Sequence, residues 1–231
     1  RTTWPGVATR SSRSSARERP PLSEAAGSAS LEVRALEVRY EGGAQPAVAG
    51  LDLTIAPGEG LVLAGPSGAG KTTALRGLLG LVPAGGHIRV LGAPAGDPLA
   101  LRAVGYAPQG RPIAATLTCE EVLGALVALR GGRAGEVAAA LRRAGLGAGS
   151  AGIRTERLDV EGARRLGLAM AIAATPRLIV LDDPWEFPET MRQIADARAR
   201  GAGVLVATDE PAGFPAAVGP VVMLAADGTP E

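Results

Sequence analysis

The chain has 231 residues, enough for one domain of ordinary size with or without a small subdomain. Hydrophobic residues make up 46% of it and aromatic residues only 3%, so its core must be built from Ala, Val, Leu and Ile. A net charge of +1 gives no support for a nucleic-acid partner, and the single cysteine, Cys119, excludes an internal disulfide and fits a reducing compartment.

Residues 1–30 differ in composition from the rest of the chain. They place five arginines among Ser, Thr and Pro and contain little that could form a core. This composition predicts a disordered basic tail, followed by a folded domain over residues 31–231. The tail lacks the apolar segment of a secretory signal. It is similar to an organelle transit peptide, but a misplaced start or a truncated sequence is the simpler explanation.

The remainder alternates between strand and helix patterns. Strands are predicted over residues 31–40, 51–55, 60–64, 87–91, 104–107, 178–181, 203–207 and 221–224. Helices are predicted over residues 73–79, 136–144, 161–174 and 189–200, and after a capping box formed by Thr118 and Glu121. This order predicts an α/β fold with a parallel sheet and a helical insert at about residues 110–160. No apolar stretch approaches the ~18 residues of a transmembrane helix, so any membrane-spanning part would belong to another chain.

A phosphate-binding loop is predicted between the strand 60–64 and the helix that follows it. Its sequence fits the pattern G-x-x-x-x-G-K-[ST] and consists of Gly65, Pro66, Ser67, Gly68, Ala69, Gly70, Lys71, Thr72 and Thr73. The glycines let several backbone N–H groups point at a phosphate, and the helix N-terminus adds unpaired amides. Lys71, the only lysine in the chain, supplies a charge for the outer phosphates, and Thr72 offers a hydroxyl to Mg²⁺.

Asp182 is the predicted partner of this loop. It follows four apolar residues, 178–181, that are typical of a buried parallel strand. A carboxylate at the end of such a strand can hold Mg²⁺ directly or through water. The loop and Asp182 together therefore predict a site for a nucleotide and Mg²⁺.

These motifs and three further segments resemble the nucleotide-binding domain of ATP-binding cassette (ABC) transporters over roughly residues 31–228. The segments are GYAPQ at 105–109, TLTCEEVL at 116–123 and RRLGLA at 164–169. The resemblance implies a P-loop NTPase fold with a mostly parallel core of the RecA type, an antiparallel β subdomain and a small helical subdomain. It implies ATP and Mg²⁺ as ligands, with Tyr40 stacking on adenine. It also implies that Gln109 contacts Mg²⁺ or water and faces a membrane subunit.

Three positions depart from the family pattern. Where the family has Leu-Ser-Gly-Gly-Gln, residues 158–162 read LDVEG. Two carboxylates would then face the γ-phosphate of ATP on a partner cassette and repel it, unless they are protonated or turned away. Asp183 replaces the glutamate that polarises the attacking water, and Asp209 replaces the switch histidine. The residues that hold ATP are thus retained, whereas those that sense and cleave the γ-phosphate are altered.

Two functions follow from the resemblance. The first is the ATP-binding subunit of an ABC transporter, which hydrolyses ATP slowly to ADP and phosphate and drives transport by a separate transmembrane permease. It would lie on the cytoplasmic face of the membrane and pair with a second cassette in a homodimer or heterodimer. The alternative is a catalytically impaired regulatory or structural subunit that binds ATP and pairs with a competent cassette.

Other P-loop proteins fit the sequence less well. A GTPase would need an Asn-Lys-x-Asp motif, and the chain contains no Asn. A small-molecule kinase would need an arginine-rich lid, but the arginines from Arg130 to Arg143 are sparse and are predicted to lie on a solvated helix face. A DNA-repair or chromosome-organising ATPase would need a long coiled-coil insert, for which the chain has no room.

Overall fold

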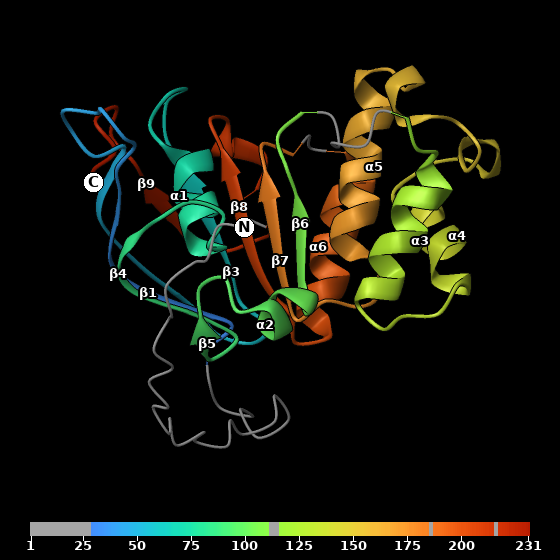
Figure 1. Ribbon diagram of the computed structural model, residues 1–231, viewed down its shortest axis with the longest axis horizontal. Coiled ribbons are helices and arrows are strands. Elements are labelled where there is room, and N and C mark those ends of the chain that lie inside the picture. The colour runs from blue at the N-terminus through green and yellow to red at the C-terminus, as the bar shows by residue number, and fades with distance from the viewer. Residues whose placement is uncertain (1–28, 111–115, 185–186, 215–216) are drawn as a thin grey trace, which may run out of the picture.

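Two sheets of different type form the framework of the molecule (Figure 1). The computed structural model describes residues 29–110, 116–184, 187–214 and 217–231. Residues 1–28 of the predicted tail lie outside this part. Ser30, the last residue of the predicted tail, is only 3% exposed.

The larger sheet is entirely parallel. Its strands are, in spatial order, β6 (Val104–Ala107), β7 (Leu178–Asp182), β8 (Gly203–Thr208), β3 (Gly60–Ala64) and β9 (Val221–Met223). β3, β7 and β8 are buried along their whole length, because apolar side chains of these strands face packed layers on both sides of the sheet.

The smaller sheet is antiparallel. Its order is β2 (Val48–Ile55), β1 (Leu31–Val38), β4 (Gly85–Val90) and β5 (Ala93–Pro94). Alternate residues of β2, such as Leu51, Leu53 and Ile55, are buried, whereas those between them are exposed. The predicted fold, a parallel core with an antiparallel β subdomain, is confirmed.

Helices cover both faces of the parallel sheet (Figure 1). They are α1 (Lys71–Leu78), α2 (Pro98–Arg102), α3 (Cys119–Leu129), α4 (Gly135–Arg143), α5 (Val160–Ile172) and α6 (Pro188–Ala199), with 3-10 turns at Ala148–Ser150, Thr155–Arg157 and Pro211–Gly213. α1 packs between the two sheets in one hydrophobic cluster, and α3 to α6 pack on the other face in a second cluster. Within the described ranges, none of these helices has the length and apolar character needed to cross a membrane.

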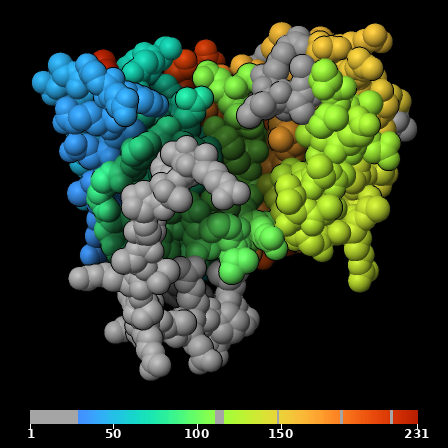
Figure 2. All heavy atoms as spheres, viewed as in Figure 1, coloured from blue at the N-terminus to red at the C-terminus, as the bar shows by residue number. Residues whose placement is uncertain are grey.

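α3 and α4 form the predicted helical insert, on the flank of the molecule opposite the antiparallel sheet (Figures 1 and 2). The predicted capping box is present at the start of α3. Thr118 Oγ1 accepts a hydrogen bond from the Glu121 N–H, and Glu121 Oε2 accepts one from the Thr118 N–H. Leu123 and Val127 of α3 are buried in the same cluster as α5, which attaches the insert to the sheet.

The sequence patterns miss one helix, α2, and extend another, α5, too far. α2 is not predicted, although Asp97 caps it by accepting from the N–H groups of Leu99 and Ala100. α5 ends at Ile172 rather than at the predicted residue 174. The reason is that Ala174 and Thr175 have φ values of 57° and 46°, which a right-handed helix does not allow.

The prediction of a solvated arginine face holds for Arg133 and Arg142, which are exposed, but it is wrong for Arg130. Arg130 follows α3, and its guanidinium donates to the carbonyl oxygens of Met170 (2.8 Å), Ala173 (2.9 Å) and Val104 (2.8 Å). Burial lowers the pKa of Arg130 to about 10. Its contacts join the helical insert to the end of α5 and to β6, which no local sequence pattern reveals.

We expect Arg130→Ala to destabilise the fold by about 3 kcal/mol, because three carbonyl groups lose a charged donor. For a chain of this length, the melting temperature should fall by about 6–12 °C. Arg133→Ala removes the same charge from an exposed position nearby and should change the melting temperature by no more than about 2 °C. Equal losses in the two variants on thermal denaturation would contradict this role of Arg130.

Candidate nucleotide-binding site

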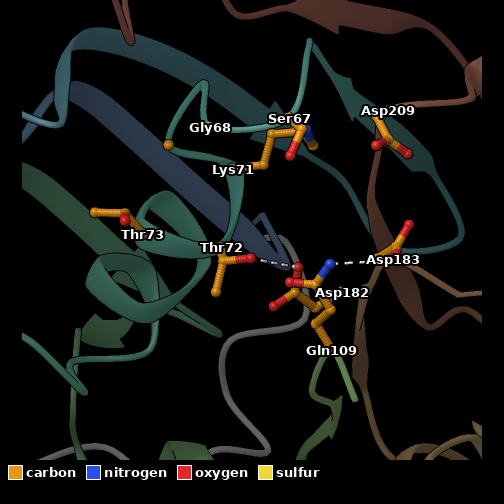
Figure 3. Close-up of a pocket in the computed structure, with 10 residues that line it drawn as sticks. Ser67, Gly68, Lys71, Thr72, Thr73, Gln109, Asp182, Asp183 and Asp209 are labelled. Carbon is orange, nitrogen blue, oxygen red and sulfur yellow. Dashed lines mark hydrogen bonds between the residues drawn. The ribbon is translucent and has the colours of Figure 1, made fainter.

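The parallel strands bring the predicted site residues to one edge of the sheet. Because all five strands run in the same direction, their carboxyl ends lie at the same edge. The phosphate loop follows β3, Gln109 follows β6, Asp182 ends β7 and Asp209 follows β8. There a pocket of about 190 Å³ is lined by Ser67, Gly68, Gly70, Lys71, Thr72, Thr73, Gln109, Asp182, Asp183 and Asp209 (Figure 3).

The phosphate loop depends on its glycines. Gly68 and Gly70 have φ values of 88° and 86°, in the left-handed region that favours glycine. A Cβ at Gly70 would lie 2.3 Å from the carbonyl oxygen of Ala47, so no larger residue fits there. α1 begins directly after Gly70 without a side-chain cap, so the amides of its first turn can serve an anion in the pocket.

Charge in the pocket is dominated by acids. Lys71 Nζ donates to the carbonyl oxygens of Gly65 (2.8 Å) and Pro66 (2.9 Å), which holds the ammonium against the loop. Among the described residues that line the pocket, Lys71 is the only cation, against the three carboxylates of Asp182, Asp183 and Asp209. Because of this excess of negative charge, the pocket should bind a polyanion in complex with a metal cation more tightly than it binds the polyanion alone.

Asp182 and Thr72 provide the oxygen donors that suit such a cation. Asp182 is only 4% exposed, and it accepts from Thr72 Oγ1 at its Oδ1 (2.9 Å). Burial raises the pKa of Asp182, although hydrogen bonds from Thr72 and others lower it in part. No cationic side chain in the described part of the chain forms an ion pair with Asp182. A buried, unpaired carboxylate beside a hydroxyl fits Mg²⁺, which is commonly held by few protein oxygens and by phosphates.

The raised pKa of Asp182 has a testable effect on stability. The folded protein binds the proton of the Asp182 carboxyl more tightly than the unfolded chain does. Protonated Asp182 therefore stabilises the fold at pH values below its unfolded pKa. This stabilisation is lost as the pH rises through the folded pKa. At neutral pH the ionised carboxylate is therefore a cost to the ligand-free fold. We expect Asp182→Asn to raise the ligand-free melting temperature by about 2–4 °C at neutral pH, with a smaller gain at acidic pH. A lower melting temperature at neutral pH would contradict this account.

Tyr106 belongs to the site but was not predicted. Its hydroxyl donates to Asp182 Oδ2 (3.4 Å). Burial, together with the negative charge of Asp182, raises the pKa of Tyr106 to about 12, so the hydroxyl stays a donor at neutral pH. Tyr106 lies on β6 and pairs with Val180 of β7, which is two residues before Asp182. The sequence alone shows only that Tyr106 belongs to a predicted strand.

Gln109 and Asp183 point toward each other across the pocket (Figure 3). Gln109 Nε2 donates to Asp183 Oδ2 (3.3 Å). Arg164, on α5, donates to the same Oδ2 (3.3 Å) and to the backbone carbonyl of Asp183 (2.5 Å). The sequence identifies Arg164 only as part of a segment similar to the family, because its contact with Asp183 depends on how α5 packs beside β7.

Tyr40 and Asp209 lie at the borders of the site. Tyr40 follows β1, is 45% exposed, and its hydroxyl lies 3.2 Å from Thr73 Oγ1 in the phosphate loop. An exposed ring at that position can stack on a base. Asp209 lies across the pocket from Thr72 and Thr73 (Figure 3) and is exposed. The adenine contact of Tyr40 and the switch role of Asp209 stay predictions.

Both acids of the segment LDVEG are engaged within the chain. Asp159 Oδ1 accepts from the Gly162 N–H (2.7 Å) and caps α5. Glu161 pairs with Arg165, one turn further along the helix (2.9 Å). That these carboxylates face the nucleotide of a partner cassette stays a prediction. One carboxylate already serves the N-terminus of α5, and the other lies along its side.

Comparisons with known proteins identify the family. The family described as "ABC transporter" matches residues 48–186, more than half of the chain. The taurine import ATP-binding protein TauB of Pseudomonas entomophila (strain L48) is 35% identical over 161 residues, which cover 67% of this chain and 61% of that protein. The lipoprotein-releasing system ATP-binding protein LolD of Anaeromyxobacter dehalogenans (strain 2CP-C) is 33% identical over 182 residues, or 71% of this chain and 74% of that protein.

Solved structures share the fold. The ATP-binding subunit of an ABC transporter has a TM-score of 0.77 at 24% identity and covers 87% of each chain. A dimeric ATP-binding cassette in a post-hydrolysis state, bound to ADP and Pi, has a TM-score of 0.78 at 21% identity, covering 87% of this chain and 96% of that one. The chain spans about three-fifths of the length of the TauB relatives. On the sequence matches and the shared fold together, the chain belongs to the ABC transporter family.

Proposed function

We propose that this protein is the ATP-binding subunit of an ABC transporter, which binds ATP with Mg²⁺ and hydrolyses it slowly. One observation carries the proposal. Thr72 of the phosphate loop and Asp182 are 110 residues apart in the sequence, yet they are joined by a 2.9 Å hydrogen bond and line the same pocket. This is the arrangement needed to hold a phosphate chain and its cation side by side.

The binding roles follow from the positions of the residues. The amides of the phosphate loop and of the first turn of α1 receive the phosphates, and Lys71 neutralises the outer ones. Thr72 and Asp182 hold Mg²⁺, with Gln109 as a further oxygen donor. Tyr40, beside Thr73, stacks on adenine. Tyr106 keeps Asp182 in its orientation by donating to the second carboxylate oxygen.

Hydrolysis depends on Asp183. It lines the pocket directly after Asp182, where it can accept a proton from a water that attacks the γ-phosphate. Bound Mg²⁺ would supply charge neutralisation on the outer phosphates. Asp183 is one methylene shorter than the glutamate of the family, and a misplacement of about 1 Å can cost ~100-fold in rate. Asp209, when ionised, cannot donate a hydrogen bond to the γ-phosphate. Both differences lead us to expect slow turnover.

The partners are a second cassette and a separate membrane permease, with the chain at the cytoplasmic face. The relatives support this proposal, because TauB is named as an import ATP-binding protein and LolD as part of a lipoprotein-releasing system. The two names differ in cargo, taurine in one and lipoproteins in the other, so the site alone does not assign either to this chain. Gln109 and the helical insert are the parts that we expect to face the permease.

A second candidate is a regulatory subunit that binds ATP and pairs with a competent cassette. One observation favours it: Asp159 already caps α5 at the position where the family has the serine for the γ-phosphate of the opposite cassette. In a homodimer, each copy would then place a carboxylate where the γ-phosphate bound to the other copy needs a hydrogen-bond donor. The two candidates agree on ATP binding and differ in turnover and in the identity of the second cassette.

Phosphate release by the purified chain distinguishes the two candidates. With protein in excess over ATP, a single turnover is measurable even when it is slow. Release that exceeds the rate of the Lys71→Ala variant supports the slow ATPase. Binding of ATP without release supports the regulatory subunit. Absence of ATP binding contradicts both.

A further inference from the structure

Arg164 and Asp183 form a contact that the roles assigned above do not use. We propose that Arg164 is a positioning residue, which fixes the carboxylate of Asp183 for the attacking water. The inference rests on the proposed function, because it concerns a residue that acts through Asp183 during ATP hydrolysis.

The contact has two points. Arg164 Nη1 donates to the backbone carbonyl of Asp183 (2.5 Å), and Nη2 donates to its carboxylate Oδ2 (3.3 Å). A planar guanidinium that binds the main chain and the side chain of one residue restricts the rotation of that side chain. The side chains are 21% and 26% exposed, so water weakens this ion pair less than it weakens a pair at the surface.

The backbone at Asp183 makes such support useful. Its φ is 52°, in the left-handed region that a residue with a side chain rarely adopts. One side of the turn is fixed by the Asp183 N–H, which donates to the Ala207 carbonyl in β8 (2.8 Å). Arg164 fixes the other side through the Asp183 carbonyl. Together they hold a turn that would otherwise be free to relax.

The two oxygens of the Asp183 carboxylate differ in their contacts. Gln109 and Arg164 both donate to Oδ2 of Asp183. Among the described residues, the contacts of this side chain are therefore concentrated on Oδ2, and Oδ1 is the oxygen that can accept from a water. Because the Asp183 carboxylate is held at Oδ2, the position of Oδ1 is also defined. This fixed position offsets part of the rate that the shorter side chain loses relative to the family's glutamate.

Arg164 reaches Asp183 from the side away from the nucleotide. Asp182 and Asp183 line the nucleotide pocket and also a second, smaller cavity, whereas Arg164 lines the smaller cavity and is not among the described residues that line the nucleotide pocket. Arg164 is therefore not placed to bind the phosphates directly. It lies in the second turn of α5, the helix that Asp159 caps, so the helix that begins at LDVEG also supports the water-polarising position.

The test compares ATP hydrolysis by the full chain with that of Arg164→Gln and Arg164→Lys under single-turnover conditions. We expect Arg164→Gln to lower the rate by about 10- to 100-fold with ATP affinity changed less than about threefold, because the phosphate loop is untouched. Arg164→Lys can keep one of the two contacts and should recover part of the rate. The neighbour Arg165→Ala is the control. It loses contacts with Glu161 and Glu189 but none with Asp183, and should lower the melting temperature more than the rate.

A double-mutant cycle on thermal stability tests the contact even when turnover is absent. Arg164→Gln and Asp183→Ala remove the same contact, so their effects on the melting temperature should be less than additive in the combined variant. Additive effects, an unchanged rate in Arg164→Gln, or a faster rate would each overturn the positioning role. A parent that binds ATP without hydrolysing it contradicts the proposed ATPase, and the cycle then decides the contact by itself.

Discussion

Lys71→Ala should weaken the binding of ATP by about 10- to 150-fold, since it removes a charged donor whose hydrogen bonds are typically worth about 1.5–3 kcal/mol. Lys71 is the only cation among the described lining residues of a pocket with three carboxylates, so no neighbour replaces its charge. Equilibrium titration with a fluorescent ATP analogue measures the loss. Hydrolysis should fall with it, because the outer phosphates are no longer held.

Arg76→Ala is the matched control for this loss. Arg76 lies on the same helix as Lys71, is exposed, and carries the same charge, but it does not line the pocket. Its removal should leave ATP affinity within about twofold, because its charge acts on Tyr106, behind Asp182, and not on the phosphates held by the loop. If the two variants lost affinity equally, the effect would come from net charge and not from the phosphate loop.

Asp183→Asn should lower the rate of ATP hydrolysis by about 100-fold or more while ATP binding is retained. The amide keeps the shape of the side chain and its contact with Arg164 through one oxygen, but it cannot take a proton from water. The variant should therefore accumulate bound ATP. Single-turnover hydrolysis and a separate binding titration measure the two effects independently.

Asp183→Glu is the companion variant. It keeps the carboxylate and adds the methylene present in the family, so hydrolysis should be retained. Loss of activity in Asp183→Glu would show that position 183 tolerates no longer side chain. Retained activity in Asp183→Asn would show that another group polarises the water, and the role given to Asp183 would be wrong.

The parts of the fold that the sequence predicts are those set by local pattern. The apolar run 178–181 specifies a buried parallel strand, Thr118 and Glu121 specify a helix start, and the glycines at 68 and 70 specify the loop. Each depends on residues only a few positions apart. Their order along the chain was then enough to predict a parallel sheet with a helical insert.

Apart from the local cap of α2 by Asp97, the interactions that escaped prediction are long-range. Arg130 donates to carbonyl groups 26 to 43 residues away, and Arg164 reaches a carboxylate 19 residues away. Tyr106 and Asp182 meet only because β6 and β7 are neighbours in the sheet. An arginine in a helical pattern gives no sign of whether it faces water or a buried carbonyl.

The central claim, that the pocket at the end of the parallel strands binds ATP with Mg²⁺, is tested most directly by titrating the unmodified chain with ATP and following its melting temperature. At ATP concentrations 100-fold above Kd, binding should stabilise the fold by about 2.7 kcal/mol and raise the melting temperature by about 5–11 °C. The rise should saturate, and it should be much smaller without Mg²⁺, because three carboxylates line the pocket. Absence of a saturable rise at millimolar ATP and Mg²⁺ would contradict the account.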